Sequence, residues 1–250
     1  MKHYSLIALL AFLMACKQPN APAASAPPLV ESKLLAFVLT PKQGMQRQFE
    51  ANLKSFAATN FTGENNFRVQ RVYGGKNDGS YVMSMGKLTS WAYYDDTTRN
   101  NDAFWEAFDA TVAPTLEEMN MDVLIYRPDL SASTQGAYAD KNTATERIVK
   151  EDKITEFENL HKKIKPVWED IGYNIAVYKN STGNTSRYVM IRRHANGWGE
   201  KDPQATNALK EAFSKRYSAK EWDDFGKQLA ACVISTHAQL QYYRKDLSGK

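Results

Sequence analysis

Hydrophobic positions change their spacing along the first half of this chain, and each change predicts a new element. The continuous apolar run 34–39 is bounded by Thr40 and Pro41, which is typical of a strand buried on both faces. Later segments show either the three- and four-residue spacing of a helix or the alternation of a half-buried strand. The expected order is strand 34–39, helix 43–58, strand 67–73, strand from Tyr81, helix from Asn101 or Asp102, and strand 121–127. Residues 33–131 are therefore predicted to form a β-α-β-β-α-β unit.

The second half of the chain follows the same order. A short, charged strand at 146–150 is expected at the edge of a sheet. Ser218 and Glu221 form a capping box that predicts the start of a helix. The other segments are helix 154–171, strand 173–178, strand from Tyr188, helix from Pro203 and strand 233–244. Residues 144–250 are predicted to form the second unit, and the polar segment 132–143 is predicted to link the two.

A sequence motif marks the two units as a duplication. Tyr-Val-Met begins at Tyr81 and again at Tyr188, and a tryptophan follows each motif, Trp91 and Trp198. Both pairs lie 107 positions apart. A constant spacing across a segment indicates a duplicated unit, so the paired residues are expected at equivalent places.

The two units also end alike, and together the repeats resemble a known architecture. Tyr-Arg-x-Asp-Leu-Ser begins at Tyr126 and, 117 positions later, at Tyr243, which indicates that about ten residues were gained in the helical region of unit two. Each unit resembles the ferredoxin-like fold, and the tandem is similar to the dimeric α+β barrel superfamily. The resemblance implies an α+β protein whose two sheets, here within one chain, face each other across a barrel.

That arrangement also bears on stability. The strand 34–39 is apolar on both faces, so helices can cover only one of them. The second face is expected to pack against the other unit, and the two units are expected to unfold together.

The first residues predict export. Lys2 and His3 precede an apolar run that is too short to span a bilayer, which is typical of a signal peptide over residues 1–15. The run ends in Leu-Met-Ala before Cys16, which resembles the lipobox of bacterial lipoproteins. That resemblance implies lipid on Cys16 and a membrane anchor, and Lys17 favours the outer membrane, facing the periplasm. Residues 16–32 are rich in Pro and Ala and predict an extended tether.

Cysteine content and net charge exclude only a few classes of function. If Cys16 carries lipid, Cys232 has no partner for a disulfide within the chain, and its apolar surroundings predict a buried, inert thiol. The net charge is +4 with both signs interspersed, which does not favour nucleic acid as a partner. No His, Cys and Asp cluster has the spacing of metal ligands.

Five residues are candidates for ligand binding. His194 could ligate haem iron or carry protons, or it could be a surface residue at the end of a strand. His237 and Gln239 belong to a polar row on the last strand, which could bind a polar ligand or bond across the interface between units. Trp91 and Trp198 could stack on a planar ligand or serve structural packing. A further histidine, His161, is expected on the solvated face of its helix.

Two function hypotheses remain open from the sequence. The first is a non-catalytic protein of the cell envelope that binds a small molecule or a partner and holds no cofactor. The alternative, implied by the barrel resemblance, is a small monooxygenase or a haem-handling enzyme. Whether the protein is an enzyme, and its oligomeric state, are not determined by the sequence, because barrels of this kind host several functions.

Overall fold

The computed structural model describes residues 32–95, 102–133 and 139–249, and the folded body lies in the compact unit Glu31–Lys250. The expected signal peptide, Cys16 and most of the expected tether lie outside the described residues. Within those residues, every helix is too short or too polar to cross a membrane.

The first half of the body has the predicted order of strands and helices. Its long helix α1 buries Phe49, Leu53 and Phe56 against the sheet, which is the predicted helical stripe. The elements are β1 (Lys33–Pro41), α1 (Gln46–Asn60), β2 (Phe67–Tyr73), β3 (Tyr81–Met85), α2 (Trp91–Asp95), α3 (Asp102–Thr111) and β4 (Leu116–Tyr126).

The second half repeats this order with a larger helical region. Ser218 caps a helix by accepting a hydrogen bond from the Glu221 backbone N–H at 3.1 Å, which confirms the predicted start of this helix. The elements are β5 (Lys141–Val149), α4 (Ile154–Asp170), β6 (Asn174–Asn180), β7 (Arg187–Arg193), η4 (Trp198–Lys201), α5 (Pro203–Arg216), α6 (Ala219–Cys232) and β8 (Val233–Tyr243).

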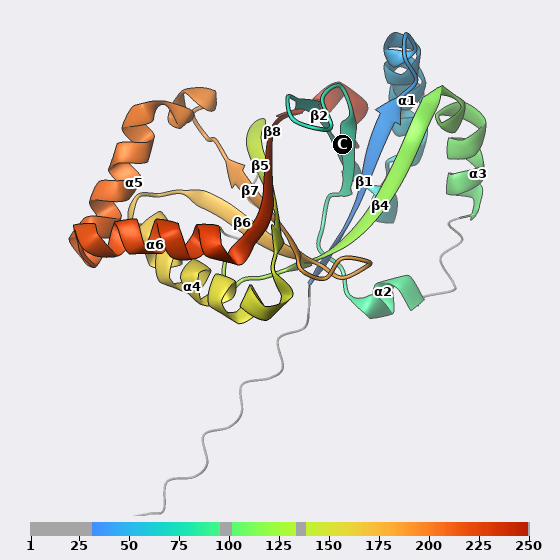
Figure 1. The fold of residues 1–250 in the computed structure, drawn as a ribbon. Helices are drawn as coiled ribbons and strands as arrows, with labels where there is room; N and C mark the ends of the chain where they lie inside the picture. The colour runs from blue at the N-terminus through green and yellow to red at the C-terminus, as the bar shows by residue number, and fades with distance from the viewer. Residues whose placement is uncertain (1–31, 96–101, 134–138, 250) are drawn as a thin grey trace, which may run out of the picture. The chain divides into compact units, whose positions relative to one another are not determined.

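The eight strands close into one antiparallel barrel in the order β1-β3-β2-β8-β5-β7-β6-β4. Each half contributes a four-stranded ferredoxin-like sheet, and the halves join where β2 pairs with β8 and β4 pairs with β6. Helices α1 and α3 lie outside the first sheet, and α4, α5 and α6 lie outside the second (Figure 1). The structure therefore confirms the predicted α+β barrel of two tandem units.

Strand β1 has apolar side chains on both faces, which is why each half is expected to depend on the other for stability. Leu35, Phe37 and Leu39 face the helices of the first half, whereas Leu34, Ala36 and Val38 face the barrel interior, here called the lumen. A strand with apolar side chains on both faces exposes one of them unless a second layer covers it. The expectation that the second face is covered by the other unit is confirmed.

The fifth strand differs from its prediction. Strand β5 begins at Lys141, inside the segment expected to be linker, and it pairs with both β7 and β8. The expectation of an edge strand was wrong, because closure of the barrel leaves β5 with neighbours on both sides. Its charged residue Glu146 is accommodated by ion pairs with Lys76 and Arg187.

The duplicated tyrosines have equivalent partners in register, and the duplicated tryptophans follow equivalent strands. In register, Leu39 pairs with Tyr81 in the first half, and Arg147 pairs with Tyr188 in the second. Each tryptophan begins a helical segment after the equivalent strand, α2 for Trp91 and the 3-10 helix η4 for Trp198. The ten additional residues lie in the helical region, where α5 and α6 have 14 residues each and α3 has 10.

Each half ends in a segment that packs into the other half. Leu247, after β8, is fully buried in the core of the first half, and Leu130, after β4, is fully buried in the core of the second. The serine that follows each leucine accepts a backbone hydrogen bond from that same core: Val69 donates to Ser248 and Val177 donates to Ser131. The repeated Arg-x-Asp-Leu-Ser motif is therefore a reciprocal clasp between the halves.

A partly buried carboxylate anchors each clasp. Arg244 donates to Glu50 of α1 at 2.7 Å, and Tyr81 of β3 donates to the same carboxylate. The hydrogen bond from Arg244 holds the pKa of Glu50 at about 2. In the other clasp, Arg127 and Tyr188 donate to Glu158 of α4.

Candidate functional site

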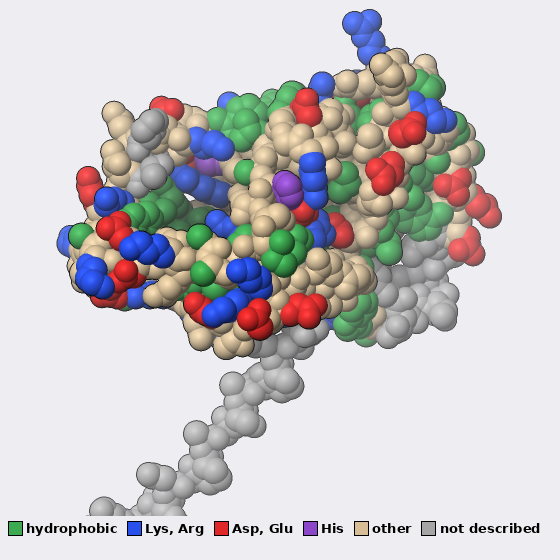
Figure 2. All heavy atoms as spheres, viewed as in Figure 1, with side chains coloured by type: hydrophobic (Ala, Val, Ile, Leu, Met, Phe, Trp, Pro, Cys, Tyr) green, Lys and Arg blue, Asp and Glu red, His purple; other side chains and the backbone are tan. Residues whose placement is uncertain are grey.

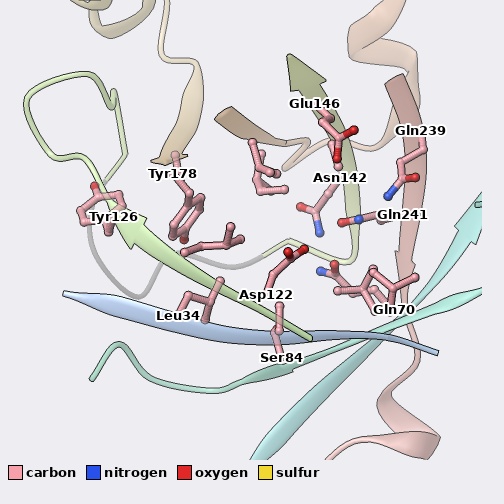
Figure 3. Close-up of a pocket in the computed structure, with 18 of the residues that line it drawn as sticks. Leu34, Gln70, Ser84, Asp122, Tyr126, Asn142, Glu146, Tyr178, Gln239 and Gln241 are labelled. Atoms are coloured by element: carbon pink, nitrogen blue, oxygen red, sulfur yellow. The ribbon is translucent and has the colours of Figure 1, made fainter. Parts of the chain in front are cut away.

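The lumen holds a cavity of about 350 Å³ between the two sheets (Figure 3). Its residues come from strands of both halves, so neither half forms the cavity alone. One wall is largely apolar and includes Leu34, Ala36, Val38, Val82, Leu124, Ala176, Val189 and Ile191. Polar or charged residues also line the cavity and include Gln70, Asn77, Asp122, Asn142, Glu146, Arg187, Arg193, His237, Gln239 and Gln241. The volume of this cavity and its mixture of apolar and polar side chains suit a small amphipathic molecule.

A chain of ion pairs crosses the lumen between the halves. Arg187 donates to Glu146 at 2.6 Å and lies 2.8 Å from Asp122, and Lys76 lies 2.6 Å from Glu146. Burial acts to raise the pKa of Glu146, but Lys76 and Arg187 outweigh it, so this pKa lies below its usual value. All four charged groups are paired, and the lowered pKa of Glu146 makes this carboxylate a weak base, so this part of the lumen suits structure better than proton transfer.

A row of amides lies on the β5 and β8 side of the lumen. Asn142 and Gln241 are opposite each other in register and are 2% and 3% exposed (Figure 3). The side-chain oxygens of both lack a hydrogen-bond partner within the described part of the chain. A buried acceptor without a donor costs about 1–3 kcal/mol, so these amides indicate a polar site that a ligand can complete.

The predicted polar row of β8 faces the lumen, and one member already bonds across it. Gln239 accepts a hydrogen bond at 3.1 Å from Asn77, in the turn between β2 and β3 of the other half. That turn approaches β8 closely, because a Cβ added at Gly75 would lie 2.8 Å from the Ala238 carbonyl oxygen. His237 lines the lumen at an exposed position. Gln239 thus bonds across the interface, while His237 and Gln241 remain available to a ligand.

His194 and Trp198 lie outside the lumen. His194 is 2% exposed, its Nε2 is 2.8 Å from Thr143 Oγ1, and its Nδ1 is 3.4 Å from Glu200 Oε2. Burial and then the positive charge of Arg192 lower its pKa. Trp198 packs against Tyr73, with ring centroids 6.3 Å apart. Neither residue lines the lumen, so the structure separates them from His237 and Gln239.

Trp91 lines a second cavity, of about 410 Å³, in the first half. This cavity is mainly apolar and aromatic and is lined by residues such as Phe37, Trp105 and Met121. The equivalent region of the second half is packed by the longer helices α5 and α6, with Phe213 and Phe225 buried. The five predicted residues are therefore distributed over three places: the lumen, the aromatic cavity and the region around η4.

Two further sequence predictions can be compared with the structure. His161 was expected on the surface, but it is 1% exposed, because its ring packs on Phe157 and its Nδ1 lies 2.9 Å from the Phe157 carbonyl oxygen. Burial lowers its pKa to about 4. The surface prediction was wrong, whereas the prediction of a buried Cys232 is confirmed.

The histidine that was proposed as an axial haem ligand is not placed in either cavity. His194 lines neither the lumen nor the aromatic cavity, whereas His237 lines the lumen at an exposed position. Among its described lining residues, the aromatic cavity contains no histidine or cysteine. Haem iron is commonly held by histidine or by a cysteine thiolate. Across the described ranges, no group of three or more His, Cys, Asp and Glu side chains is placed to hold a metal ion.

The most informative lumen residues were not among the five candidates predicted from the sequence. Arg187, Arg193 and Asn142 each lie on strands of alternating or charged sequence, where polar side chains usually face solvent. Closure of the barrel turns that face inward. One sequence pattern could have indicated these residues: Arg187, Val189, Ile191 and Arg193 alternate along one face of the strand. That face can be assigned to the interior only once β7 is known to lie between β5 and β6.

No family model and no curated protein matches this chain. Among solved structures, a putative monooxygenase from Fusobacterium nucleatum subsp. nucleatum is similar with a TM-score of 0.56 and 11% identity, over 87% of this chain and 94% of that one. A putative monooxygenase from Lactobacillus acidophilus has a TM-score of 0.51 and 12% identity, over 85% and 94%. A mutant of the chlorite dismutase from Candidatus Nitrospira defluvii has a TM-score of 0.50 and 7% identity, over 87% and 94%.

These likenesses show the fold alone. They extend over most of this chain and of each similar chain. At such low identity they carry no residue roles from those proteins to this one, because one fold hosts many chemistries.

Proposed function

We propose that this protein binds a small amphipathic molecule inside its barrel, without catalysis, at the surface of a membrane. The observation that carries the proposal is the lumen itself: a cavity with an apolar wall and two buried amides whose oxygens have no partner among the described residues. Filled by a ligand, these amides would gain hydrogen bonds and the apolar wall would lose contact with water.

The chemistry of the lumen favours binding over catalysis. A general base needs a pKa near the working pH and access to the proton it removes. Glu146 has a lowered pKa and is paired with Lys76 and Arg187, which makes it a poor base. The monooxygenase alternative would need a reactive group, and the lining of the aromatic cavity, within the described chain, supplies apolar and aromatic side chains with Asn65 and Thr182.

Filling the lumen should abolish binding. Ala176 is 1% exposed and lies on the lumen wall, so Ala176→Phe places a ring in the cavity. We expect the affinity for 1-octanol, measured by titration calorimetry, to fall at least about tenfold, which corresponds to about 1.4 kcal/mol.

Two variants provide the controls. Ala176→Ser adds only one oxygen atom and should bind 1-octanol like the wild type. Trp91→Ala alters the aromatic cavity and should also leave the affinity unchanged. If Trp91→Ala loses binding while Ala176→Phe retains it, the ligand site is the aromatic cavity and the proposal for the lumen is wrong.

The membrane part of the proposal rests on the sequence. The apolar run before Cys16 resembles a lipobox, and the Pro- and Ala-rich segment after it suits a tether between lipid and barrel. The charge of the body is compatible with an aqueous compartment, because acidic and basic side chains are interspersed over the face seen in Figure 2. We place the protein in the cell envelope, anchored in the outer membrane and facing the periplasm.

Removing the thiol of Cys16 should release the protein. Several acyl chains on one residue anchor firmly, since each buried methylene contributes about 0.8 kcal/mol. We expect Cys16→Ser to move the protein from the detergent phase to the aqueous phase in a phase-partition experiment. Cys232→Ser keeps the anchor and should stay in the detergent phase. Wild-type protein that is found in the aqueous phase, with a different first residue, would contradict lipidation.

A further inference from the structure

Two arginines of β7 face the same lumen but have different partners. Arg187 is paired with two carboxylates, Asp122 and Glu146. Arg193, at the other end of the strand, donates from Nη1 to Ser133 Oγ at 2.9 Å and to Asn174 Oδ1 at 3.1 Å, and both partners are uncharged. Within the described chain, no carboxylate lies within ion-pair distance of Arg193.

Basic side chains outnumber acidic ones among the described residues that line the lumen. Four of these residues are basic, Lys76, Lys87, Arg187 and Arg193, and two are acidic, Asp122 and Glu146. Both acidic groups are engaged by Arg187 and Lys76. A partly buried guanidinium with uncharged partners favours a nearby anion, because its charge is less screened than at the surface.

The surroundings of Arg193 are suited to a carboxylate. Asn142 pairs with Arg193 on one side in register and with Gln241 on the other, so the two buried amides and the guanidinium form one cross-strand row. A guanidinium offers a planar fork of donors that matches a carboxylate. The amide oxygens of Asn142 and Gln241, which lack a donor within the described chain, accept hydrogen bonds only from water or from a ligand group with a proton. Arg193 therefore supplies both the charge and the directional donors for an anion.

An apolar track leads away from this row. Ile191 and Val189 follow Arg193 along the lumen side of β7, and Leu34, Leu124 and Ala176 lie on other strands around the same space. From Arg193 to Arg187 the strand rises about 20 Å at roughly 3.4 Å per residue. An alkyl chain along Ile191 and Val189 would thus have room before the ion pairs begin.

We infer that Arg193 recognises the carboxylate of an amphipathic ligand whose apolar part lies along Val189 and Ile191. The inference rests on the proposed binding in the lumen and specifies the chemical class of the ligand: a monocarboxylate with an aliphatic chain.

Three probes of equal chain length test this inference: octanoate, 1-octanol and octylamine, each titrated calorimetrically into the protein. We expect octanoate to bind at least about tenfold more tightly than 1-octanol and octylamine to bind most weakly, because a charge-assisted pair with Arg193 is available only to the carboxylate. Arg193→Gln should remove the preference for octanoate while leaving the affinity for 1-octanol unchanged. Arg192→Gln is the matched control: Arg192 points to the outer face, where it stacks on Tyr173, and its loss should not alter the preference.

The outcomes separate this inference from the proposed function. If 1-octanol binds and Ala176→Phe abolishes its binding, but octanoate binds no better or Arg193→Gln retains the preference, the lumen is a binding site and the assignment of a carboxylate is wrong. If none of the probes binds, the proposed function fails, and the inference fails with it. A preference lost equally in Arg192→Gln would point to general surface charge and would also overturn the inference.

Discussion

Residues 33–131 expressed alone should not give a stable folded monomer. The isolated first half would lose Leu247 from its core, and it would lose Arg244, which donates to Glu50. Strands β8 and β6, which pair with β2 and β4, would also be missing. It would also expose the lumen face of β1 to water. We therefore expect aggregation or self-dimerisation on size-exclusion chromatography, because two copies could cover each other's exposed sheet faces.

The complete body, residues 32–250, is the control for that experiment. It should elute as a folded species and unfold thermally in a single cooperative transition, because each clasp spans the halves. A well-folded monomer of residues 33–131 would show that the sheets do not need each other. Two separate unfolding transitions of the complete body would contradict the same expectation.

Removing the charge of one clasp carboxylate should destabilise the body measurably. Arg244, from the end of the second half, holds the pKa of Glu50 at about 2, against an ordinary value of 4.5. Such a lowering corresponds to at most roughly 3 kcal/mol, and solvent screening at this partly exposed group reduces it to about 1–2 kcal/mol. Glu50→Gln should lower the free energy of unfolding at pH 7 by that amount, as measured by urea denaturation.

The effect should depend on pH in a defined direction. The pKa of Glu50 is lower in the folded than in the unfolded protein, so its contribution is complete above about pH 4.5. It is lost progressively as the pH falls towards 2, where the carboxylate becomes protonated in both states. The stability difference between wild type and Glu50→Gln should therefore shrink on acidification below pH 4.5.

The second clasp supplies a matched variant. Burial opposes ionisation of Glu158, but Arg127 and Tyr188 hold its pKa at about 2 as well. Glu158→Gln should behave like Glu50→Gln, and the double variant should lose about the sum of both effects, because the carboxylates share no partner. A variant difference that stays constant from pH 7 to pH 3 would show that the charge of the carboxylate does not stabilise the clasp.

Much of the fold could be predicted from the sequence because it depends on local spacing. The apolar run before Pro41 and the helical stripe of α1 each bury one defined face, and that pattern is visible without tertiary contacts. The repeat from Tyr81 to Tyr188 added the duplication, and with it the tandem barrel. The alternation of His237, Gln239 and Gln241 correctly indicated a polar face towards the interior.

Burial and pairing at particular residues depended on the tertiary structure. His161 has a polar side chain among lysines in the sequence, yet it is buried, because Phe157 and Trp168 enclose its ring. The charged segment around Glu146 predicted an edge, whereas closure of the barrel provides a neighbouring strand and two cationic partners. Local sequence does not reveal which partner a charge will meet across the molecule.

The sequence by itself determined the order of elements, the duplication and the inward polar row of the last strand, since these follow from periodicity within short segments. Only the tertiary structure decided that the Arg-x-Asp-Leu-Ser motif at the end of each half packs into the other half, where Leu130 and Leu247 are buried in the opposite core. It also decided that Arg187 is neutralised while Arg193 is not. The physical reason is that these properties depend on contacts between residues far apart in the chain, where closure of the barrel sets the distance between charges.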